Sequence, residues 1–321
     1  MSGPVSVIIP VFNRPTQIIE AVESVLEQNY RPLEIIVVDD GSTDETYAAM
    51  QELKSHNPQL IKLVQTANRG PGPAREVGRQ LAGGDYIQYL DSDDVLYSNK
   101  FELQVKALER NPQCQIAYGK TRYRSEDNFK ESAHGKRTGE QIETMFPSFL
   151  AGRWWSTLTP LYRRAISDRA GPWLDLKQEE DWEYDARVAA LGIKLCFVDE
   201  FVCEVRSHSE DRISQMQLGL RTKLSSIAQA RQLIYAHAIE AKLNPSFPEM
   251  QIFSRSAFHL ARQCGAAGLG KESQKLFALS RRASGRPNKK EYLVYHFLAH
   301  ALGWHRLGQL CCWRDRIKIG K

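Results

Sequence analysis

Two acidic clusters in the sequence have the residue types and the spacing to hold a charged ligand. Asp39 and Asp40 open the stretch "DDGSTDE", and Asp91, Asp93 and Asp94 belong to "DSDD". Side chains two positions apart on an extended segment point the same way, so Asp91 and Asp93 can serve one ligand. Hard cations such as Mg²⁺ or Mn²⁺ prefer carboxylate oxygens and usually keep substrate phosphates as further ligands. The second cluster therefore indicates a cation and phosphate site, although loop aspartates also form plain turns.

A third acidic group, "EEDWEYD", lies at the start of a helix that we expect to begin near Gln178. The positive end of the helix dipole favours acidic residues in a first turn, and such residues are commonly inert. A carboxylate at this place can also act as a general base. The residues alone leave both interpretations open.

The first two clusters follow short apolar runs that are typical of buried strands. These runs are "VSVIIP", "LEIIVVD", "LIKLVQT" and "DYIQYL", and segments with helical spacing of apolar residues separate them. Alternating strands and helices predict an α/β fold, with a mainly parallel, Rossmann-like sheet covered by helices on both faces. Ligands bind such sheets beyond the carboxyl ends of the strands. We therefore expect residues 10–13, 39–44 and 91–94 to meet in one crevice.

From about residue 215 the sequence predicts only amphipathic helices, which divides the chain into domains at 1–214 and 215–321. The second part contains 18 Lys and Arg against 5 Asp and Glu, and the first contains 25 against 33. A basic surface can face phosphate, an anionic bilayer or nucleic acid. No nucleic-acid-binding module is recognisable, so we expect no nucleic acid partner. The tail 307–321 mixes apolar and basic residues as interfacial helices do, although a docked end is the alternative.

The remaining composition is that of a cytoplasmic protein. No apolar run reaches the roughly 18 residues of a membrane span, and a first strand at Val5 leaves no room for a signal peptide. The six cysteines show neither zinc spacing nor a CxxC pair, which favours reduced thiols. We expect a cytoplasmic location, peripheral at the inner face of the membrane if the basic helices bind lipid.

Six motifs in order resemble the family 2 glycosyltransferases over about residues 5–214. They are "VSVIIPVFNR", "ESVLEQNY", "LEIIVVDDGSTDET", "NRGPGPAR", "GDYIQYLDSDD" and "EEDWEYDARVAALG". The resemblance implies the GT-A fold and a nucleotide-sugar donor, most often a UDP-sugar, bound with Mn²⁺ or Mg²⁺. It also implies hexosyl transfer to a glycan or lipid-linked acceptor with inversion of the anomeric configuration, as in the assembly of bacterial polysaccharides or glycolipids.

The same resemblance implies roles for residues around the nucleotide. Pro10 and Phe12 match positions that flank the base and ribose. Asp40 matches the residue that accepts a hydrogen bond from the uracil imide, and Asp39 the neighbour that shapes the strand end. Arg75 matches a partner of the nucleotide. Glu76 departs from the family pattern, which commonly has asparagine there.

Further residues match the metal and diphosphate positions. Asp91 matches a residue near the ribose and donor sugar, and Asp93 matches the direct metal ligand, with Asp94 in a structural role. His208 is a candidate third metal ligand, although a loop histidine is commonly solvated. Arg206 or Arg212 is the expected diphosphate contact.

On the acceptor side, the resemblance assigns Asp181 as the catalytic base and Glu180 as its positioning neighbour. Glu179 takes the role if the register differs by a residue. The tryptophans at 154, 155 and 173 either stack on sugar or pack in the core.

Two other classes of protein compete with this interpretation. A non-catalytic scaffold would act through its basic helical module, and degenerate family members should have lost the base or the metal pair. This chain keeps Asp93 and Asp181. A nucleotidyltransferase would need a glycine-rich loop after the first strand, and "VFNRPT" contains no glycine.

Overall fold

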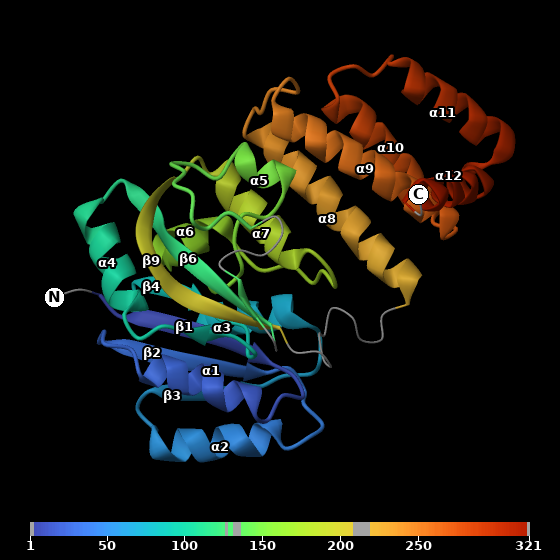
Figure 1. The fold of residues 1–321 in the computed structure, drawn as a ribbon. Coiled ribbons are helices and arrows are strands. Elements are labelled where there is room, and N and C mark those ends of the chain that lie inside the picture. The colour runs from blue at the N-terminus through green and yellow to red at the C-terminus, as the bar shows by residue number, and fades with distance from the viewer. Residues whose placement is uncertain (1–2, 126–127, 131–135, 208–218, 320–321) are drawn as a thin grey trace. The chain divides into compact units, whose positions relative to one another are not determined.

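The computed structural model describes residues 3–125, 128–130, 136–207 and 219–319 (Figure 1). The chain divides into two compact units. The first comprises Met1–Met145, Arg153–Asp175 and Leu191–Arg212, and the second comprises Phe146–Gly152, Leu176–Ala190 and Ile213–Lys321. The second unit thus includes two segments that precede residue 214. The expected domains, 1–214 and 215–321, stay a prediction.

The described residues of the first unit form a nine-stranded mixed sheet with the order β3-β2-β1-β4-β8-β6-β9-β5, in which β7 also pairs with β6. The longest ladders, among β1 to β4 and between β6 and β9, are parallel. This confirms the mostly parallel α/β sheet. The strands are β1 (Val5–Val11), β2 (Leu33–Asp39), β3 (Ile61–Gln65), β4 (Tyr86–Tyr89), β5 (Val95–Leu96), β6 (Cys114–Ser125), β7 (Asn128–Lys130), β8 (Leu161–Arg163) and β9 (Lys194–Ser207).

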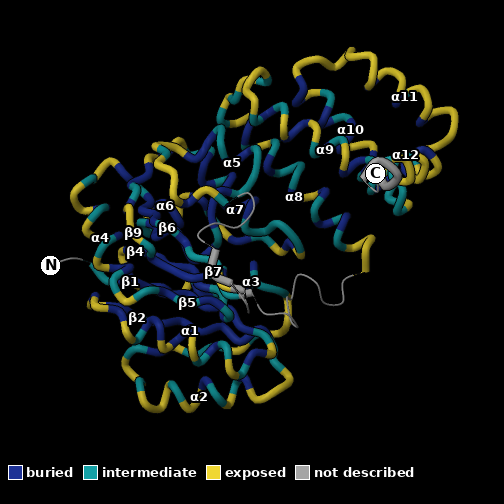
Figure 2. Tube along the Cα trace, viewed as in Figure 1, coloured by how far each residue is buried: buried dark blue, intermediate teal, exposed yellow. Residues whose placement is uncertain are grey.

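Helices cover this sheet because its central strands are apolar on both faces. Figure 2 shows these strands as buried, with a dark blue trace. Val7 and Ile9 pack with Val22 of α1 in one core cluster. Ile8 faces α3, where a Cβ at Gly78 would lie 2.3 Å from the Ile8 Cγ2 atom, so the glycine permits close packing. The helices of this unit are α1 (Gln17–Leu26), α2 (Thr46–His56), α3 (Pro71–Leu81), α4 (Lys100–Arg110) and α6 (Arg164–Ala170).

The register of the central strands places three loops at one edge of the sheet. Val11 of β1 pairs with Asp39 of β2, and Ile8 of β1 pairs with Tyr89 of β4. Because β2, β1 and β4 are parallel neighbours, the segments that follow them start side by side. The acidic clusters at 39–40 and 91–94 therefore follow the two strands on either side of β1.

The second unit is entirely helical among its described residues. Its core contains Leu224 of α8, Cys264 of α9, Leu276 and Phe277 of α10 and Tyr295 of α11. The helices are α5 (Ser148–Ala151), α7 (Glu180–Ala190), α8 (Leu220–Glu240), α9 (Pro248–Ala266), α10 (Gly270–Ala283), α11 (Lys290–Leu302) and α12 (Trp304–Ile319).

Two glycines allow α12 to pack closely on α9. A Cβ at Gly308 would lie 2.4 Å from the Ala266 backbone nitrogen, and one at Gly265 would lie 2.7 Å from the Trp304 carbonyl oxygen. Leu307 is buried in the same contact. The carboxy-terminal tail is therefore a docked helix over its described residues. None of the helices in the described ranges is both long and apolar enough to cross a bilayer.

Candidate active site

The loop after β1 is tied to the loop after β2 by Asn13. Its backbone N–H donates to Ser42 Oγ at 2.9 Å, and its side-chain oxygen accepts from the Thr43 backbone N–H at 2.8 Å. Asn13 has a φ of +50°, a conformation that asparagine tolerates better than most residues. Pro10 is buried and Phe12 half-buried beside this link. Ser42 and Thr43 are residue types that often cap helices, but here both bind Asn13 and α2 begins only at Thr46.

Asp39 and Asp40 are both buried at the end of β2 and hold the neighbouring loops. Asp39 accepts hydrogen bonds from the Ser42 backbone N–H at 3.1 Å and from Gln65 Nε2 at 2.9 Å. Asp40 accepts the backbone N–H groups of Arg69 at 2.9 Å and Gly70 at 2.7 Å. Asp40 therefore orders the entry to α3, and its expected contact with a uracil imide stays a prediction.

Two buried arginines neutralise the carboxylates of "DSDD". Arg75 of α3 donates from Nη2 to Asp91 Oδ1 at 2.6 Å, and Arg14 forms an ion pair with Asp93. The neighbouring Asp94 is buried and accepts the Arg206 backbone N–H at 3.0 Å. Burial, and then the charges of Asp93 and Asp91, raise the pKa of Asp94 well above its ordinary value. The site thus concentrates negative charge that guanidinium groups balance.

The donor set of this loop fits a hard divalent cation. The side chains of Asp91 and Asp93 are partly exposed, at 31% and 22%. Two carboxylates complemented by substrate phosphates are a usual Mg²⁺ or Mn²⁺ environment. No group of three or more metal-binding side chains occurs within the described ranges. His208 and Arg212, expected as metal ligand and diphosphate contact, lie outside the described residues.

Arg206 of β9 holds the "DSDD" loop in place. Its Nε donates to the Asp93 carbonyl oxygen at 2.8 Å, and its guanidinium forms an ion pair with Glu20 of α1. Its buried Nη2 has no hydrogen-bond partner among the residues that the structure describes. This nitrogen is a donor that a ligand oxygen can satisfy.

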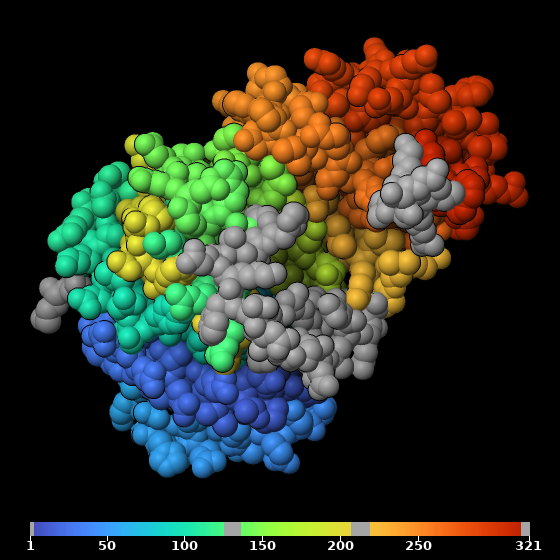
Figure 3. Space-filling model, in the orientation of Figure 1, coloured from blue at the N-terminus to red at the C-terminus, as the bar shows by residue number. Residues whose placement is uncertain are grey.

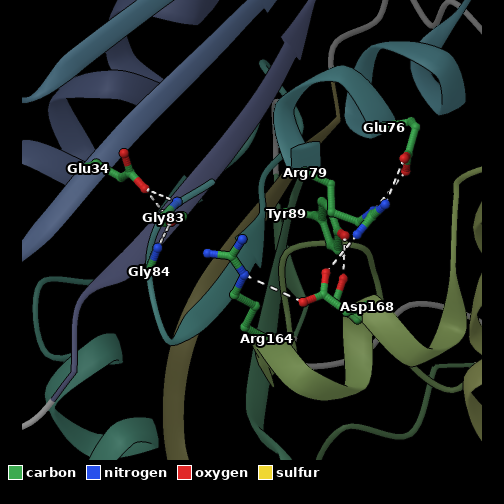
Figure 4. Close-up of polar contacts among 10 residues, drawn as sticks. Glu34, Glu76, Arg79, Gly83, Gly84, Tyr89, Arg164 and Asp168 are labelled. Atoms are coloured by element: carbon green, nitrogen blue, oxygen red, sulfur yellow. Dashed lines mark hydrogen bonds and ion pairs between the residues drawn. The ribbon is translucent and has the colours of Figure 1, made fainter. Parts of the chain in front are cut away.

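Figure 4 shows the contacts of Glu76, which occupies a position where the pattern of family 2 glycosyltransferases commonly has asparagine. Glu76 accepts from Arg79 at 2.8 Å, and Arg79 also donates to Asp168 of α6 at 2.7 Å. Burial acts to raise the pKa of Glu76, but the hydrogen bonds and charge of Arg79 outweigh it and leave the pKa below its ordinary value. Glu76 also accepts the Trp173 backbone N–H at 3.2 Å. This network fixes α3, the helix that carries Arg75.

The predicted base lies on α7, in the second unit. Asp181 and Glu180 are half-buried in its first turn, and Asp181 Oδ1 accepts the Trp182 backbone N–H at 2.7 Å. Glu179, the alternative base, is engaged by Arg231 of α8 through two hydrogen bonds of 2.7 and 2.8 Å. The role of Asp181 stays a prediction.

The family model for glycosyl transferase family 2 matches residues 6–167, about half of the chain. The chain belongs to this family. The family predicted from the sequence motifs is therefore confirmed.

Curated relatives in family 2 match only parts of their own length. An uncharacterized glycosyltransferase of Rickettsia felis is 39% identical over 150 residues, which are 46% of this chain and 22% of that protein. The chondroitin synthase of Escherichia coli is 30% identical over 184 residues, 55% of this chain and 26% of that enzyme. The chain spans about a quarter or less of the length of these two relatives.

Solved structures match nearly the whole chain. S. aureus TarS 1–349 in complex with UDP-GlcNAc has a TM-score of 0.73 at 19% identity, covering 97% of this chain and 92% of TarS 1–349. The mannosyltransferase PcManGT from Pyrobaculum calidifontis, in complex with GDP-Man and Mn²⁺, has a TM-score of 0.55 at 18% identity, covering 96% and 84%. This likeness confirms the GT-A fold of the family 2 chain.

All three tryptophans near the expected acceptor side are buried, which favours the packing alternative. Trp173 packs edge-on against Tyr89 at 4.9 Å, and the guanidinium of Arg75 lies 4.7 Å from its ring centre. Trp155 packs against Tyr118, and Arg137 lies over Trp154 at 4.2 Å.

Arg14 was not expected at the site, and Asn13 was expected only as part of the crevice segment 10–13. Both follow β1 directly, and β1 is the neighbour of the strands that precede the two acidic clusters. Their types, an amide and a cation at the edge that holds the acidic loops, could have indicated the contacts of Asn13 with residues 42–43 and of Arg14 with Asp93.

Proposed function

We propose that the protein is a metal-dependent inverting glycosyltransferase that moves a sugar from a UDP-sugar to an acceptor hydroxyl. The observation that carries the proposal is the pair Asp91 and Asp93, which lies in a family 2 chain beside the loops of β1 and β2. The likeness to TarS, whose structure contains UDP-GlcNAc, supports a UDP-sugar as donor.

The donor is held by its base and by its diphosphate. The uracil of the donor nucleotide lies against Pro10 and Phe12, near Asp39 and Asp40. Arg75 is buried, and its ion pair with Asp91 fixes the orientation of its guanidinium. The guanidinium can therefore bind an anionic diphosphate. The Nη2 of Arg206, which has no hydrogen-bond partner within the described part of the chain, offers one more donor at the same loop.

The carboxylates of Asp91 and Asp93 would hold Mn²⁺ or Mg²⁺, in keeping with the Mn²⁺ in PcManGT. When bound, this ion supplies positive charge that stabilises the departing diphosphate. Arg14 and Arg75 form ion pairs with these two carboxylates. His208 remains the proposed third ligand, and Arg212 a proposed diphosphate contact.

Asp181 accepts the proton of the acceptor hydroxyl. The acceptor oxygen then bonds to the anomeric carbon as the bond to the diphosphate oxygen breaks, and the in-line geometry inverts the configuration. Glu180 positions the base. The start of α7 favours the anionic carboxylates on which this role depends.

The acceptor is a glycan or a lipid-linked glycan at the cytoplasmic face of a membrane. Similarity to the E. coli chondroitin synthase supports polysaccharide assembly as the setting.

The test is a donor panel with purified protein, Mn²⁺ and UDP-, GDP- and dTDP-sugars. Binding is measured by calorimetry and turnover by release of free nucleotide. We expect metal-dependent binding of one UDP-sugar, lost in Asp93→Asn. Asp181→Asn should keep donor binding and lower kcat by about 10²- to 10⁴-fold, the usual contribution of a general base.

Asp199→Asn is the matched control, because Asp199 is an acidic residue whose side chain is 80% exposed on β9. It should leave binding and turnover unchanged. If no donor binds in the presence of metal, the enzyme proposal fails and the scaffold alternative gains support. If Asp181→Asn turns over at the normal rate, another residue is the base.

A further inference from the structure

Helix α11 is apolar on both of its sides. Its inner side contributes Tyr292, Tyr295 and Ala299 to the core of the helical unit. The opposite side, which we call the outer face of α11, consists of Leu293, Val294, Phe297, Leu298 and Leu302. These positions follow helical spacing, so their side chains share one surface.

The outer face is exposed to a degree that is unusual for such residues. Phe297 is 72% exposed, and Leu293 and Val294 are each 48% exposed. In Figure 2 the trace of α11 is largely yellow, and Figure 3 shows the carboxy-terminal helices at the surface of their unit. A helix that is apolar all round is normally buried on all sides. A contiguous apolar surface of this kind marks an interaction site.

Cations flank the outer face in the sequence, where Lys289 also pairs with the exposed Glu291 at 3.0 Å. Lys289 and Lys290 precede its first residue, and Arg306 follows its last, and all three are exposed. Residues 289–321 contain seven Lys and Arg against two Asp and Glu. On the next helix, Trp313 is 65% exposed and Leu310 lies one turn before it. Exposed Leu, Phe and Trp with basic neighbours are the composition of a helix that lies in a bilayer interface.

The charge distribution distinguishes a bilayer from a second copy of the chain. In a two-fold dimer the outer face would meet itself, and its positive rim would oppose the same positive rim. Like charges across an interface are unfavourable. An anionic lipid surface instead complements the rim while its acyl chains accept the apolar side chains.

We propose that the outer face of α11 binds the interface of an anionic bilayer. The main binding element is therefore α11, because Leu307 and Gly308 of the tail 307–321 are used in packing on α9. This proposal adds a membrane site to the proposed function and does not depend on it.

The experiment is co-sedimentation of the full chain with vesicles. One set is phosphatidylcholine alone, and the other has about one third phosphatidylglycerol, a composition that supplies the surface charge. We expect clear binding to the anionic set only. Leu293→Gln with Phe297→Gln should weaken that binding at least about tenfold, because two anchoring side chains are lost. Lys290→Glu with Arg306→Glu should weaken it similarly at low salt.

Leu220→Gln with Ile239→Gln is the matched control, because both residues are exposed on α8 of the same unit, at 67% and 49%. It should bind vesicles as the parent does. Equal thermal midpoints would show that the variants fold. Unchanged binding in the α11 variant, or no binding by the parent chain, would overturn the proposal.

A dimer in sedimentation velocity that Leu293→Gln with Phe297→Gln dissociates would also overturn it, in favour of self-association. Donor binding is measured in the same preparations. A preparation that binds vesicles but no donor would mean that the enzyme proposal fails while the membrane proposal stands.

Discussion

Arg14 provides a direct test of how the acidic loop receives a metal ion. Its guanidinium already pairs with Asp93. A divalent cation at Asp93 would be repelled by this charge, and the repulsion between charges of +2 and +1 at 5 Å is about 2 kcal/mol even at the dielectric constant of water. We expect Arg14→Gln to raise Mn²⁺ affinity several-fold, measured by electron paramagnetic resonance of free Mn²⁺ without donor.

Lys62→Gln is the control for the loss of one positive charge, because Lys62 pairs with Glu34, at the opposite end of β2 from Asp39, at 2.7 Å. Its Mn²⁺ affinity should equal that of the parent. Weaker Mn²⁺ binding in Arg14→Gln would mean instead that Arg14 orients Asp93 for the metal.

Lys100 is a fully buried cation whose Nζ donates to the Thr159 carbonyl oxygen at 2.9 Å. Burial lowers the pKa of Lys100 from 10.5 to about 8. The unfolded chain therefore takes up this proton at a higher pH than the folded chain. The free energy of unfolding should fall as pH decreases from 10.5 to about 8, and the full penalty remains below that range.

We expect Lys100→Met to be more stable than the parent at neutral pH by up to about 3 kcal/mol, and to lose this pH dependence. Gln104 also donates to the Thr159 carbonyl oxygen, at 3.0 Å, so that acceptor stays satisfied. Urea unfolding at neutral and alkaline pH measures the difference. Lys106→Met, at an exposed position on the same helix, should change little. A less stable Lys100→Met would show that the ammonium contributes more than its burial costs.

At the scale of elements, α7 is held to α8 by a buried charge cluster. Glu183 is 1% exposed, accepts from Arg187 at 2.8 Å, and lies 3.0 Å from His237 Nε2. Glu183→Gln keeps the shape but removes the charge between these two groups. We expect the free energy of unfolding of the helical unit to fall by about 3 kcal/mol, measured by urea unfolding followed through far-ultraviolet circular dichroism.

Glu240→Gln is its control, because Glu240 lies 3.8 Å from Nδ1 of the same histidine and its side chain is 75% exposed. A change below about 0.5 kcal/mol is expected there. Equal losses in the two variants would show that burial of Glu183 is not what matters.

For the whole molecule, the sequence predicted the sheet and the position of its acidic loops. Strands buried on both faces appear as unbroken apolar runs such as "VSVIIP", and parallel order follows from the intervening helices. The carboxyl ends of β1, β2 and β4 are accordingly neighbours. These features depend on local pattern and on topology, which a sequence carries directly.

Contacts between distant residues could not be predicted in the same way. Ser42 and Thr43 have good capping propensity, but Asn13, about 30 residues earlier, binds them instead. The tail 307–321 has the composition of an interfacial helix, but its glycine and leucine fit against α9. Residues 290–302 have few polar positions to mark which of their apolar residues stay exposed. In each case the outcome depends on which element packs alongside.

The apolar outer face of α11 also has a practical consequence for anyone who purifies the protein. Salting-out ions such as sulfate strengthen apolar association. Ammonium sulfate should therefore make the protein bind a phenyl resin through Phe297 and its neighbours. At high protein concentration it should make the protein aggregate. A mild detergent that covers the outer face of α11 should keep the concentrated protein in solution.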